Sequence, residues 1–402
     1  MQQEIQNLKK LLNALGNPQD KLKVIHIAGT NGKGSCGLLL STLLNHSKSK
    51  SSRNCPTVGW FHSPSLEKDQ DILINLRKIP ESKLEQFTAS ATVTNFQVSA
   101  FEKRVVIAIL AFIEMKCELC IFECGMGGLN DATNIFNFKE LAIITKIGYD
   151  HQGFLGNTLA DITIHKLGII QNSSQSIMAI DQYPEVLTVV SSMQLLANEL
   201  QLISSASLIE ASKYSFSWQY KNVTFSSKLL GIHQGINMGL VIEATMRLTD
   251  YEFDYSVANN AVWPGRLQYV PYKSKNILFD GSHNSDSILA LRKYLDEFLS
   301  EQLIILFCCS GKNKNAEELL DILTIGRNDT VYLSSFKIPE DMPWVTTTPL
   351  DNYGKYQHLD LCEIEAISSL IGISNAQVLV CGSLYFIHDI FMSLSIGLSF
   401  TN

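Results

Sequence analysis

Short apolar runs alternate with amphipathic stretches along most of this chain. Compact runs of aliphatic and β-branched residues are typical of strands buried in a parallel sheet. Between these runs the apolar positions have the spacing of helices, as in the apolar segment 37–44. The alternation predicts an α/β fold whose strands are mostly parallel. The predicted strands occupy residues 23–28, 119–122, 141–147, 277–279, 303–309 and 377–380.

Three segments bear on the organisation of the chain. Residues 1–17 have the pattern of an amphipathic helix and lack the continuous apolar stretch of a signal peptide. Residues 47–54 are polar and basic and predict a loop. Around 259–265 the helical pattern gives way to a loop with an adjacent proline and glycine, and a new strand follows soon after. We therefore expect a first domain at 1–260 and a second at 261–402.

The composition restricts the function classes. Of the 402 residues, 46% are hydrophobic and 18% charged, so the chain can bury a sizeable core. The net charge of −7 argues against nucleic acid or an anionic membrane as a partner, because both require a basic field. No apolar run approaches the length of a membrane span. The nine cysteines are dispersed and odd in number, which is typical of a reduced, cytoplasmic protein.

A glycine-rich segment follows the first predicted strand. It reads Gly-Thr-Asn-Gly-Lys-Gly-Ser over residues 29–35 and leads into the apolar helix. Glycines let successive backbone N–H groups point into one concavity, to which the start of the helix adds positive potential and Lys33 a charge for phosphates. The spacing differs from the common G-x-x-x-x-G-K-[ST] loop. A turn that only caps a helix is the alternative, but the order of strand, lysine, hydroxyl and helix favours nucleotide binding.

Two further strands end in groups that suit a nucleotide site. Glu123 follows the run 119–122, and the run 141–147 delivers Asp150 and His151 to the same edge of the sheet. Ligands of parallel α/β sheets bind beyond the carboxyl ends of the strands, where a carboxylate is a natural ligand for the magnesium that accompanies ATP. On its own, a histidine in this place is more often a structural group than a metal ligand.

Taken in order, these segments resemble one family, the folylpolyglutamate synthase/dihydrofolate synthase branch of the Mur-type amide ligases. The resemblance extends from near the start of the chain to near its end, and several blocks are specific to this branch. The blocks are ALGNPQDKLKVIHIAGTNGKGS (14–35), FHSPSLEKDQDILIN (61–75), FECGMGGLNDATN (122–134), IITKIGYDHQGFLGNTLADITIHKLGII (143–170), LLGIHQGIN (229–237), WPGRLQ (263–268), DGSHN (280–284) and CGSLY (381–385).

The resemblance implies an N-terminal P-loop-like ATPase domain with a mostly parallel sheet and a folate-facing cleft, followed by a smaller Rossmann-like α/β domain. It also implies a ligase that forms C–N bonds. The carboxylate of a folate or dihydropteroate would take the γ-phosphoryl group of ATP, and the amino group of L-glutamate would then attack the acyl phosphate. Mg²⁺ is the implied cofactor, K⁺ is a further candidate ion, and the family expectation is a monomer.

The resemblance also assigns roles to the residues that match the family's motifs. Lys166 corresponds to a lysine that the family carbamylates, which turns a cation into a carboxylate able to orient a second magnesium ion. Without the resemblance, Lys166 would be an ordinary lysine on a helix surface. The assigned residues are Gly32, Lys33, Gly34, Ser35, Asn237, Arg266 and Asp280 for ATP; Ser63, Glu123 and His151 for the metal; and Lys33, Lys166 and His151 for catalysis.

On the folate side, the resemblance assigns an aromatic-acidic block and the segment after the glycine pair to substrate binding. Phe101 could stack on a flat heterocycle, although a phenylalanine at helical spacing is more often part of the core. The assigned residues are Ser99, Ala100, Phe101, Glu102, Asn130, Asp131 and Ala132.

This side of the site also departs from the family's pattern. Leu129 stands where the family has an arginine, and Asn130 stands where it has a leucine. A leucine cannot pair with an anion, so we expect weaker recognition of dihydropteroate and retained activity on reduced folates. The alternatives are a Mur-type amino-acid ligase with another carboxylate acceptor and a non-catalytic ATP-binding homologue. The second is disfavoured because the whole set of phosphate and metal residues is present.

Overall fold

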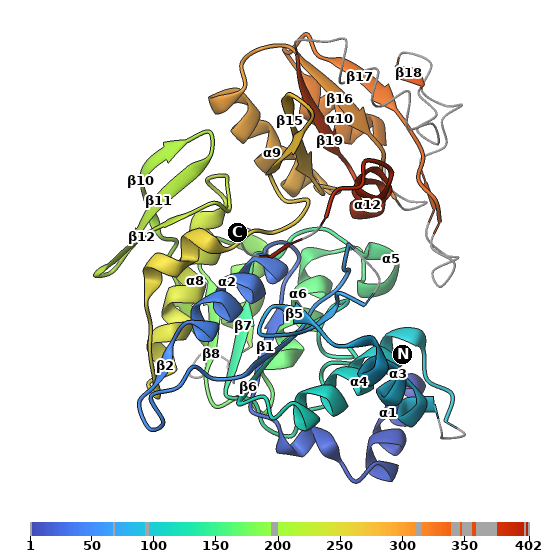
Figure 1. Cartoon of the computed structure of the whole chain (residues 1–402), viewed down its shortest axis with the longest axis vertical. Coiled ribbons are helices and arrows are strands. Elements are labelled where there is room, and N and C mark those ends of the chain that lie inside the picture. The colour runs from blue at the N-terminus through green and yellow to red at the C-terminus, as the bar shows by residue number, and fades with distance from the viewer. Residues whose placement is uncertain are drawn as a thin grey trace. The chain divides into compact units, whose positions relative to one another are not determined.

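The computed structural model describes residues 2–66, 69–92, 96–193, 200–310, 316–338, 346–347, 356–358, 376–397 and 399–400 (Figure 1). The chain divides into two units, each held together by its own contacts. Unit 1 comprises residues 1–210, 217–227 and 234–261, and unit 2 comprises residues 211–216, 228–233 and 262–402. The chain therefore enters unit 2 twice, briefly, before it stays there from residue 262 onward.

Unit 1 is built on an eight-stranded sheet with the order β5-β4-β3-β6-β1-β7-β8-β9. The strands from β3 to β9 in this order are parallel, and β4 and β5 are added at one edge through antiparallel pairs. Every residue of the central β1 is buried, as is typical of a parallel strand covered on both faces. The strands are β1 (Val24–Ala28), β3 (Val58–Phe61), β4 (Ile72–Ile74), β5 (Arg77–Lys78), β6 (Leu119–Glu123), β7 (Leu141–Ile144), β8 (Ser176–Ala179) and β9 (Leu200–Ile203).

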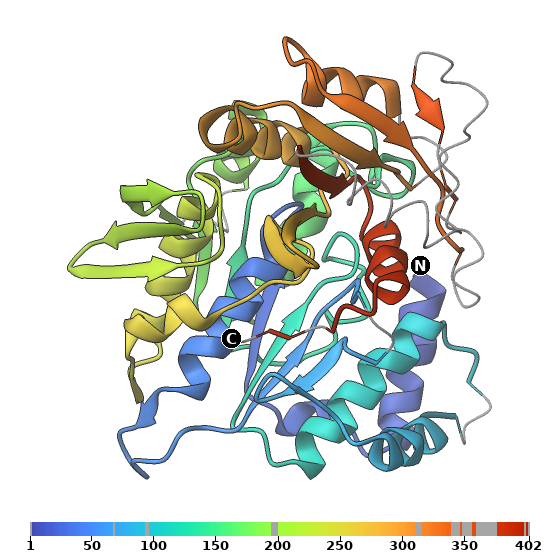
Figure 2. The ribbon, with the colours of Figure 1, turned by 45° about the horizontal axis from the view of Figure 1, so that its top comes forward.

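Helices cover both faces of this sheet (Figures 1 and 2). Successive strand residues point to opposite faces, and on β3 Trp60 packs on Gly37 of α2 whereas Phe61 joins the cluster with α4. Helix α8 packs beside α2, and α6 contributes to the core on the face of α4. Among the described helices, none is both long and apolar enough to cross a bilayer. The helices of unit 1 are α1 (Gln2–Ala14), α2 (Lys33–Asn45), α3 (Glu81–Thr92), α4 (Ala100–Glu114), α5 (Gln152–Leu155), α6 (Leu159–Leu167), α7 (Pro184–Ser192) and α8 (Gln234–Arg247), with 3₁₀ turns η1 (Pro18–Lys21), η2 (Gly168–Ile170) and η3 (Tyr255–Asn260).

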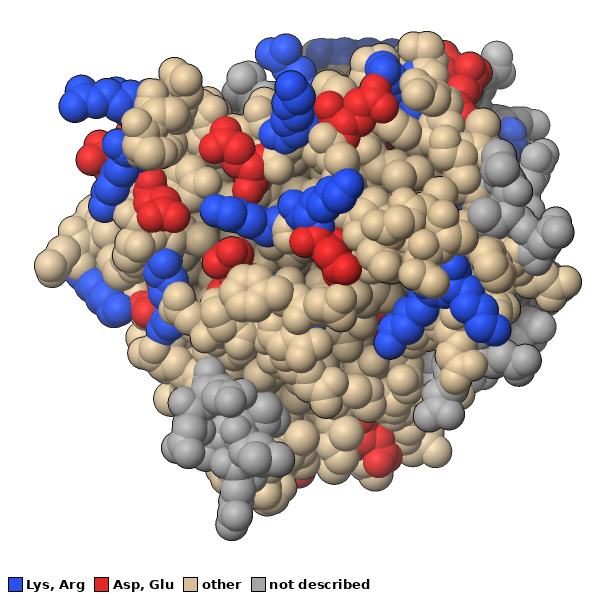
Figure 3. All heavy atoms as spheres, turned by 90° about the horizontal axis from the view of Figure 1, so that it is seen from below, with Lys and Arg blue, Asp and Glu red and all other residues tan. Residues whose placement is uncertain are grey.

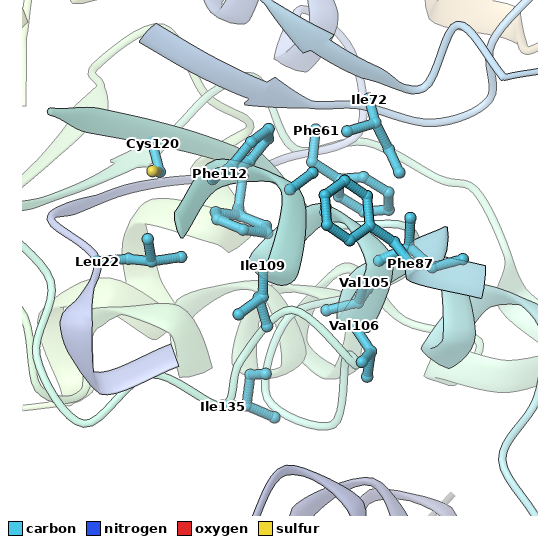
Figure 4. Packing of buried hydrophobic residues seen from close by; sticks show 14 of the residues in the cluster. Leu22, Phe61, Ile72, Phe87, Val105, Val106, Ile109, Phe112, Cys120 and Ile135 are labelled. Carbon is cyan, nitrogen blue, oxygen red and sulfur yellow. The ribbon is translucent and has the colours of Figure 1, made fainter. Parts of the chain in front are cut away.

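A cluster of buried apolar side chains lies between α4 and the sheet. Figure 4 shows Phe61, Ile109 and Phe112 within this cluster. The rings of Phe112 and Phe122 meet edge to face with their centroids 5.5 Å apart. A Cβ on Gly59 would lie 2.6 Å from the Phe112 ring, so a glycine is needed for the helix to approach β3 this closely. Burial of one such side chain contributes about 1.5–3 kcal/mol, and the cluster thereby fixes β3 and β6, which lead into the site.

Two small sheets accompany the large one. Strands β10 (Ser207–Ser212), β11 (Ser215–Tyr220) and β12 (Val223–Ser227) form a three-stranded sheet. Strand β2 (Lys48–Ser49) pairs antiparallel with β13 (Tyr251–Glu252). The prediction of a loop over residues 47–54 is therefore wrong for the two residues of β2, whose backbone groups bond to a partner distant in sequence.

Unit 2 contains a six-stranded sheet with the order β14-β15-β19-β16-β17-β18. All neighbours from β15 onward are parallel, and β14 forms an antiparallel pair with β15 at the edge. The Phe279 ring of β15 meets the Phe391 ring of α12 edge to face, with centroids 4.6 Å apart. Helices α9 and α10 pack against each other. The elements are β14 (Gln268–Tyr272), β15 (Lys275–Asp280), β16 (Leu303–Phe307), β17 (Thr330–Leu333), β18 (Gln357–His358), β19 (Gln377–Cys381), α9 (Ser285–Phe298), α10 (Ala316–Thr324) and α12 (Leu384–Ser393).

The predicted fold class is confirmed: a first unit with a mostly parallel sheet and a second, smaller α/β unit. Two predicted strands are too long. The run 141–147 leaves the sheet after Ile144, because the Lys146 carbonyl accepts the backbone N–H groups of the glycine-rich loop instead. The run 303–309 ends as a strand at Phe307, although the two cysteines that follow are buried.

Charge is mixed on the face of the molecule that Figure 3 shows. Basic and acidic side chains lie next to one another over much of its upper half. Fields of opposite charges that alternate in this way largely cancel, and salt screens what is left beyond about 8–10 Å. Among the residues that are not drawn in grey, this face therefore has no extended basic area.

Candidate active site

The glycine-rich loop connects β1 to α2 and passes close to two other elements. Gly32 caps α2 with a φ of +95°, a conformation that favours glycine. A Cβ at Gly29 would overlap the Thr145 hydroxyl, and a Cβ at Gly32 would overlap the side-chain amide of Asn237 on α8. Because only glycine fits at both positions, the loop backbone lies directly against the segment after β7 and against α8.

Thr30 ties this loop to the segment after β7. Its Oγ1 donates to the Gly148 carbonyl at 2.9 Å and accepts from the Gly148 N–H at 3.0 Å, while its own N–H donates to the Lys146 carbonyl at 2.8 Å. Thr30 has no role that its sequence pattern predicts, since a hydroxyl in a loop is too common to be a signal. The contacts fix the loop relative to the segment that leads to Asp150 and His151.

The first turn of α2 presents a cation and backbone amides. In an α-helix the N–H groups of the first turn have no acceptor within the helix, so those of Lys33, Gly34 and Ser35 are suited to an anion. Lys33 Nζ lies 3.3 Å from the Thr30 carbonyl and 3.8 Å from Glu123 Oε1. Both charged side chains are largely buried, with 16% of the Lys33 side chain and 6% of the Glu123 side chain exposed. The Lys33 ammonium and the Glu123 carboxylate therefore lie close together beside the glycine-rich loop.

The other predicted metal residues follow neighbouring strands of the sheet. Ser63 comes two residues after β3, Glu123 ends β6, and His151 lies beyond β7. Since β3, β6, β1 and β7 are adjacent and parallel, their carboxyl ends lie along one edge of the sheet. The His151 side chain is 46% exposed, and its Nε2 lies 3.8 Å from Asp150 Oδ2. The fold thus brings the phosphate loop and these residues to one edge, where parallel α/β sheets bind ligands.

Lys166 is not a surface lysine. Only 3% of this residue is exposed, and its Nζ donates a hydrogen bond of 2.7 Å to the Gly29 carbonyl, at the base of the phosphate loop. Burial, reinforced by the positive charge of Lys33, lowers the pKa of Lys166 to about 7. A substantial fraction of its amine is therefore neutral near neutral pH, which is the form that reacts with carbon dioxide.

The donor set fits magnesium better than a metal held by protein groups alone. Within the described ranges, no group of three or more His, Cys, Asp or Glu side chains lies close enough to hold a metal ion. Mg²⁺ is usually bound by one or two carboxylates together with substrate phosphates and water. Glu123 beside the phosphate loop, with the Ser63 hydroxyl two residues beyond the neighbouring strand, agrees with that mode.

Ser99 and Glu102 are bound to each other at the start of α4. The Ser99 Oγ accepts from the Glu102 N–H at 3.2 Å, and Glu102 Oε2 accepts from the Ser99 N–H at 2.6 Å and from its hydroxyl at 2.8 Å. This is a capping box, and it satisfies the N–H groups of Ser99 and Glu102 at the helix start. In this structure the two side chains hold α4 in place. Ala100 opens the helix between them.

Phe101 lies beside the segment that follows Glu123. Its ring meets Phe61 at a centroid distance of 5.7 Å, and a Cβ on Gly125 would lie 2.6 Å from its tip. The side chain is only partly buried. Phe101 therefore packs partly against the core cluster. Its stacking on a heterocycle stays a prediction.

Asp131 uses both carboxylate oxygens within its own loop. Oδ2 accepts the Met126 N–H at 2.8 Å, and Oδ1 accepts the Thr133 N–H at 2.9 Å and the Thr133 hydroxyl at 2.5 Å. The residue is buried, and this burial raises its pKa despite the hydrogen bonds that oppose the shift. Asp131 therefore shapes the segment 125–134, which we call the folate-side loop. Ala132 is buried in the core cluster behind this loop.

A buried histidine on β1 contacts the same loop. His26 on β1 is fully buried, and its Nε2 lies 2.8 Å from Thr133 Oγ1 and 3.1 Å from Cys124 Sγ. Since the Thr133 hydroxyl donates to Asp131, it accepts from the Nε2–H of a neutral imidazole. Burial lowers the pKa of His26 well below its usual value. This contact could not be predicted from the sequence, because the partners lie on separate strands and loops.

Leu129 and Asn130 line a pocket of about 330 Å³ beside α1. Leu129 is 37% exposed, so the position where the family has an arginine opens onto this pocket. The other lining residues are mostly amides, with one lysine: Ile5, Gln6, Lys9, Asn134, Gln171 and Asn172. These walls suit a ligand with several hydrogen-bonding edges.

Asn237 contacts the phosphate loop within unit 1. Its side chain packs on Gly32, and its Nδ2 donates to Gln234 Oε1 at 2.8 Å. The other two predicted ATP residues belong to unit 2. There Asp280 accepts the N–H groups of Leu267 and Ser282 at 2.9 and 3.0 Å, and Arg266 Nη1 donates to the Gly281 carbonyl at 2.9 Å. Arg266 and Asp280 thus belong to one cluster at the end of β15.

Known proteins resemble this chain along nearly its whole length. A family model described as "Dihydrofolate synthetase, C-terminal domain" matches residues 266–394. The chain is 31% identical over 416 residues to the dihydrofolate synthetase of Saccharomyces cerevisiae, covering 95% of each chain. It is 30% identical over 419 residues to the dihydrofolate synthase/folylpolyglutamate synthase of Bacillus subtilis, covering 95% of this chain and 93% of that protein. A Mycobacterium tuberculosis folylpolyglutamate synthase, solved with ADP and AMPPCP, shares the fold with a TM-score of 0.81 at 21% identity, covering 98% of this chain and 96% of that one.

Proposed function

The chain belongs to the family of dihydrofolate synthetases and folylpolyglutamate synthases, and we propose from this membership and from its site that it joins L-glutamate to a folate at the expense of ATP. The product bond is an amide, so the enzyme is a ligase that forms C–N bonds. The acceptor carboxylate takes the γ-phosphoryl group of ATP, the glutamate amine attacks the acyl phosphate, and inorganic phosphate leaves.

The observation that carries this proposal is the pair of Lys33 and Glu123 beside the phosphate loop. The reaction brings a carboxylate to a triphosphate, and the two anions repel each other. Lys33 and the amides at the start of α2 offset that repulsion and stabilise the transferred phosphoryl group. A buried carboxylate such as Glu123 would itself repel phosphates unless a cation lay between them. Its position therefore favours a metal-bound nucleotide.

We propose that the metal is Mg²⁺, held by the Ser63 hydroxyl, the Glu123 carboxylate and a neutral imidazole nitrogen of His151. When bound, this ion supplies charge that neutralises the phosphate oxygens. K⁺ enters the proposal only through the family resemblance. The exposed His151 keeps its ring accessible at the edge of the sheet.

Lys166 completes the proposed apparatus as a carbamate. Its neutral amine adds carbon dioxide and loses one proton, which leaves a carboxylate on Nζ. The modified nitrogen keeps one N–H, and this group can still donate to the Gly29 carbonyl that Nζ contacts here. A negative charge at the base of the phosphate loop would orient a second magnesium ion.

The remaining assignments stay proposals of the same kind. We propose that Gly32, Gly34, Ser35 and Asn237 of unit 1 bind ATP. The assignment of Arg266 and Asp280, which belong to unit 2, to ATP rests on the family resemblance. The division into domains at 1–260 and 261–402 and the monomeric state are proposed on the same basis.

Two acceptors are supported by different observations. The relatives that are 31% and 28% identical are named dihydrofolate synthetase and probable dihydrofolate synthetase, which favours dihydropteroate. Leu129, which cannot pair with an anion, favours a reduced folate. Both acceptors carry a pterin, for which the amide-lined pocket beside α1 offers hydrogen-bonding groups.

A coupled phosphate-release assay tests the function. Purified protein, ATP, Mg²⁺ and L-glutamate are combined with dihydropteroate or with tetrahydrofolate, and mass spectrometry identifies the product. We expect release that requires both an acceptor and glutamate. If neither dihydropteroate nor tetrahydrofolate supports phosphate release, the assignment is wrong. In that case, thermal stabilisation by ATP and Mg²⁺ alone would favour a different acceptor or a non-catalytic ATP-binding protein.

A further inference from the structure

Lys139 is a fully buried lysine that neither the predicted mechanism nor the family motifs use. It lies two residues before β7, and only 1% of it is exposed. Its ammonium donates three hydrogen bonds, to Asn134 Oδ1 at 2.8 Å and to the carbonyls of Ile169 and Gln171 at 2.7 Å each. An ammonium has three protons, so all of them are used. Burial lowers the pKa of Lys139 to about 8.

These three acceptors come from two different segments. Asn134 is the last residue of the folate-side loop, whereas Ile169 and Gln171 lie at the end of η2, directly after α6. The backbone of Lys139 is docked at the same place, because its N–H donates to the Asn172 carbonyl and its carbonyl accepts from Ser174, each at 2.8 Å. One side chain therefore joins the end of the loop to the end of the helix that carries Lys166.

The loop and the helix end touch so closely that little movement is allowed. The Leu129 N–H donates to the His165 carbonyl at 2.6 Å. A Cβ on Gly128 would lie 2.8 Å from the His165 carbonyl oxygen and 2.9 Å from that of Lys166. Asn134 adds a hydrogen bond of 3.2 Å from its Nδ2 to the Gly168 carbonyl. A shift of the loop would therefore either break its own hydrogen bonds or displace the last turn of α6.

We propose that Lys139 is a positioning residue of the ligase, which clamps the folate-side loop onto the end of α6 and so keeps the folate-contacting residues in register with Lys166. This inference rests on the proposed function, because it takes the loop to face the folate. All three protons of its ammonium bond protein acceptors, so the proposal gives Lys139 no contact with a substrate. It acts through Asn134 and through the carbonyls of the helix end, where a cation also interacts favourably with the helix dipole.

The test compares Lys139→Met, which removes the charge and all three donors, with Lys139→Arg, which keeps a cation. Asn134→Ala removes the arm to the loop together with the hydrogen bonds from Asn134 Nδ2 to the Leu129 and Gly168 carbonyls, and serves if the Met variant does not fold. The control is Glu243→Gln, which weakens the two ion pairs that a different buried carboxylate of unit 1 forms with Lys221 and Arg247. Each variant is measured for KM of the folate acceptor, KM of ATP and kcat, and hydrogen–deuterium exchange is followed in the ligand-free protein.

We expect Lys139→Met and Asn134→Ala to raise the folate KM by about 10-fold or more while the ATP KM stays within about 2-fold, since only the loop side is released. Amide exchange should rise across 125–134 and stay unchanged across 29–35. Lys139→Arg should have a folate KM between those of the wild type and Lys139→Met. Unchanged loop exchange with a normal folate KM would overturn the clamp, and so would an equal rise of the folate KM in Glu243→Gln. If the wild-type protein shows no activity on folates, the proposed function fails, whereas the exchange experiment still decides on the clamp.

Discussion

The ammonium of Lys166 donates a hydrogen bond of 2.7 Å to the carbonyl of Gly29, the first residue of the glycine-rich loop. A lysine on α6 thus supports the backbone that we propose to cradle the ATP phosphates. The contact joins two segments more than a hundred residues apart in sequence. It places the most perturbed amine of the site directly under the phosphate loop, with Lys33 among the causes of its lowered pKa.

Lys166→Ala should lose most of the activity, by about 10²-fold or more, because the site loses the charge that orients the second metal ion. Formate or acetate should restore part of it by replacing the missing carboxylate. Because the pKa of Lys166 is lowered to about 7, the neutral amine that binds carbon dioxide accumulates as pH rises through this value. Wild-type activity should therefore gain from added bicarbonate more at pH 8 than at pH 6. A high-resolution map of an active, ATP-bound crystal with an unmodified Lys166 would contradict the carbamate.

Lys33→Ala should lower turnover by about 10² to 10⁴, since it removes the charge closest to the transferred phosphoryl group. Its thermal stability should fall somewhat, because the largely buried Glu123 carboxylate loses the cation that lies 3.8 Å away. Lys221→Ala is the matched control, as it removes a lysine that pairs with Glu243 elsewhere in unit 1. Both are compared in the phosphate-release assay under saturating ATP. Wild-type turnover by the Lys33 variant would refute the phosphate-loop assignment.

His26→Gln should make the stability of the protein less dependent on pH below neutrality. The pKa of His26 is well below 6.5 in the folded state and about 6.5 in the unfolded state. Below pH 6.5 the unfolded chain therefore binds more protons, and the free energy of unfolding falls as pH falls, by at most about 1.4 kcal/mol per pH unit for this one group. Urea unfolding between pH 5 and 7.5 measures the slope, which should be shallower in the variant. Thr133→Val, which removes the contact but keeps the histidine, should retain the wild-type slope.

The placement of Lys33 and Glu123 could be predicted from the sequence, because both belong to segments that follow clearly buried strands. Glu123 stands at the end of β6, and Lys33 follows β1 after the short glycine-rich loop. Parallel strands end at one edge of a sheet, so order along the chain translates into proximity. The orientation of the Asp131 carboxylate could not be predicted from the sequence. A motif match assigns it to the folate, but only the loop conformation shows that both its oxygens accept N–H and O–H groups of Met126 and Thr133.

Two other residues show what sequence signals omit. The spacing of Ser99 and Glu102 is that of a capping box, and this local signal would have predicted their mutual hydrogen bonds before any role in binding. Lys139 gives no such signal. Lysines are almost never fully buried unless they are paired, and its acceptors are backbone carbonyls whose position depends on the tertiary structure. Its burial could not be deduced from the pattern of polar residues.

Leu129→Arg tests the departure that bears on the choice of acceptor. The wild-type side chain opens onto the pocket beside α1 and cannot donate a hydrogen bond. A hydrogen bond to a charged group is typically worth about 1.5–3 kcal/mol, so the arginine should raise kcat/KM for dihydropteroate by about 10- to 100-fold and leave the KM of ATP unchanged. Ile164→Arg is the control, because it adds the same charge at an exposed position of α6 that does not line the pocket.

Steady-state kinetics on dihydropteroate and tetrahydrofolate are compared for the three proteins. Because Leu129 cannot pair with an anion, we expect the wild-type enzyme to prefer tetrahydrofolate. A much higher kcat/KM for dihydropteroate would refute this expectation and favour the acceptor that the relatives' names suggest. If the arginine leaves the dihydropteroate rate unchanged, its absence is not what limits that acceptor.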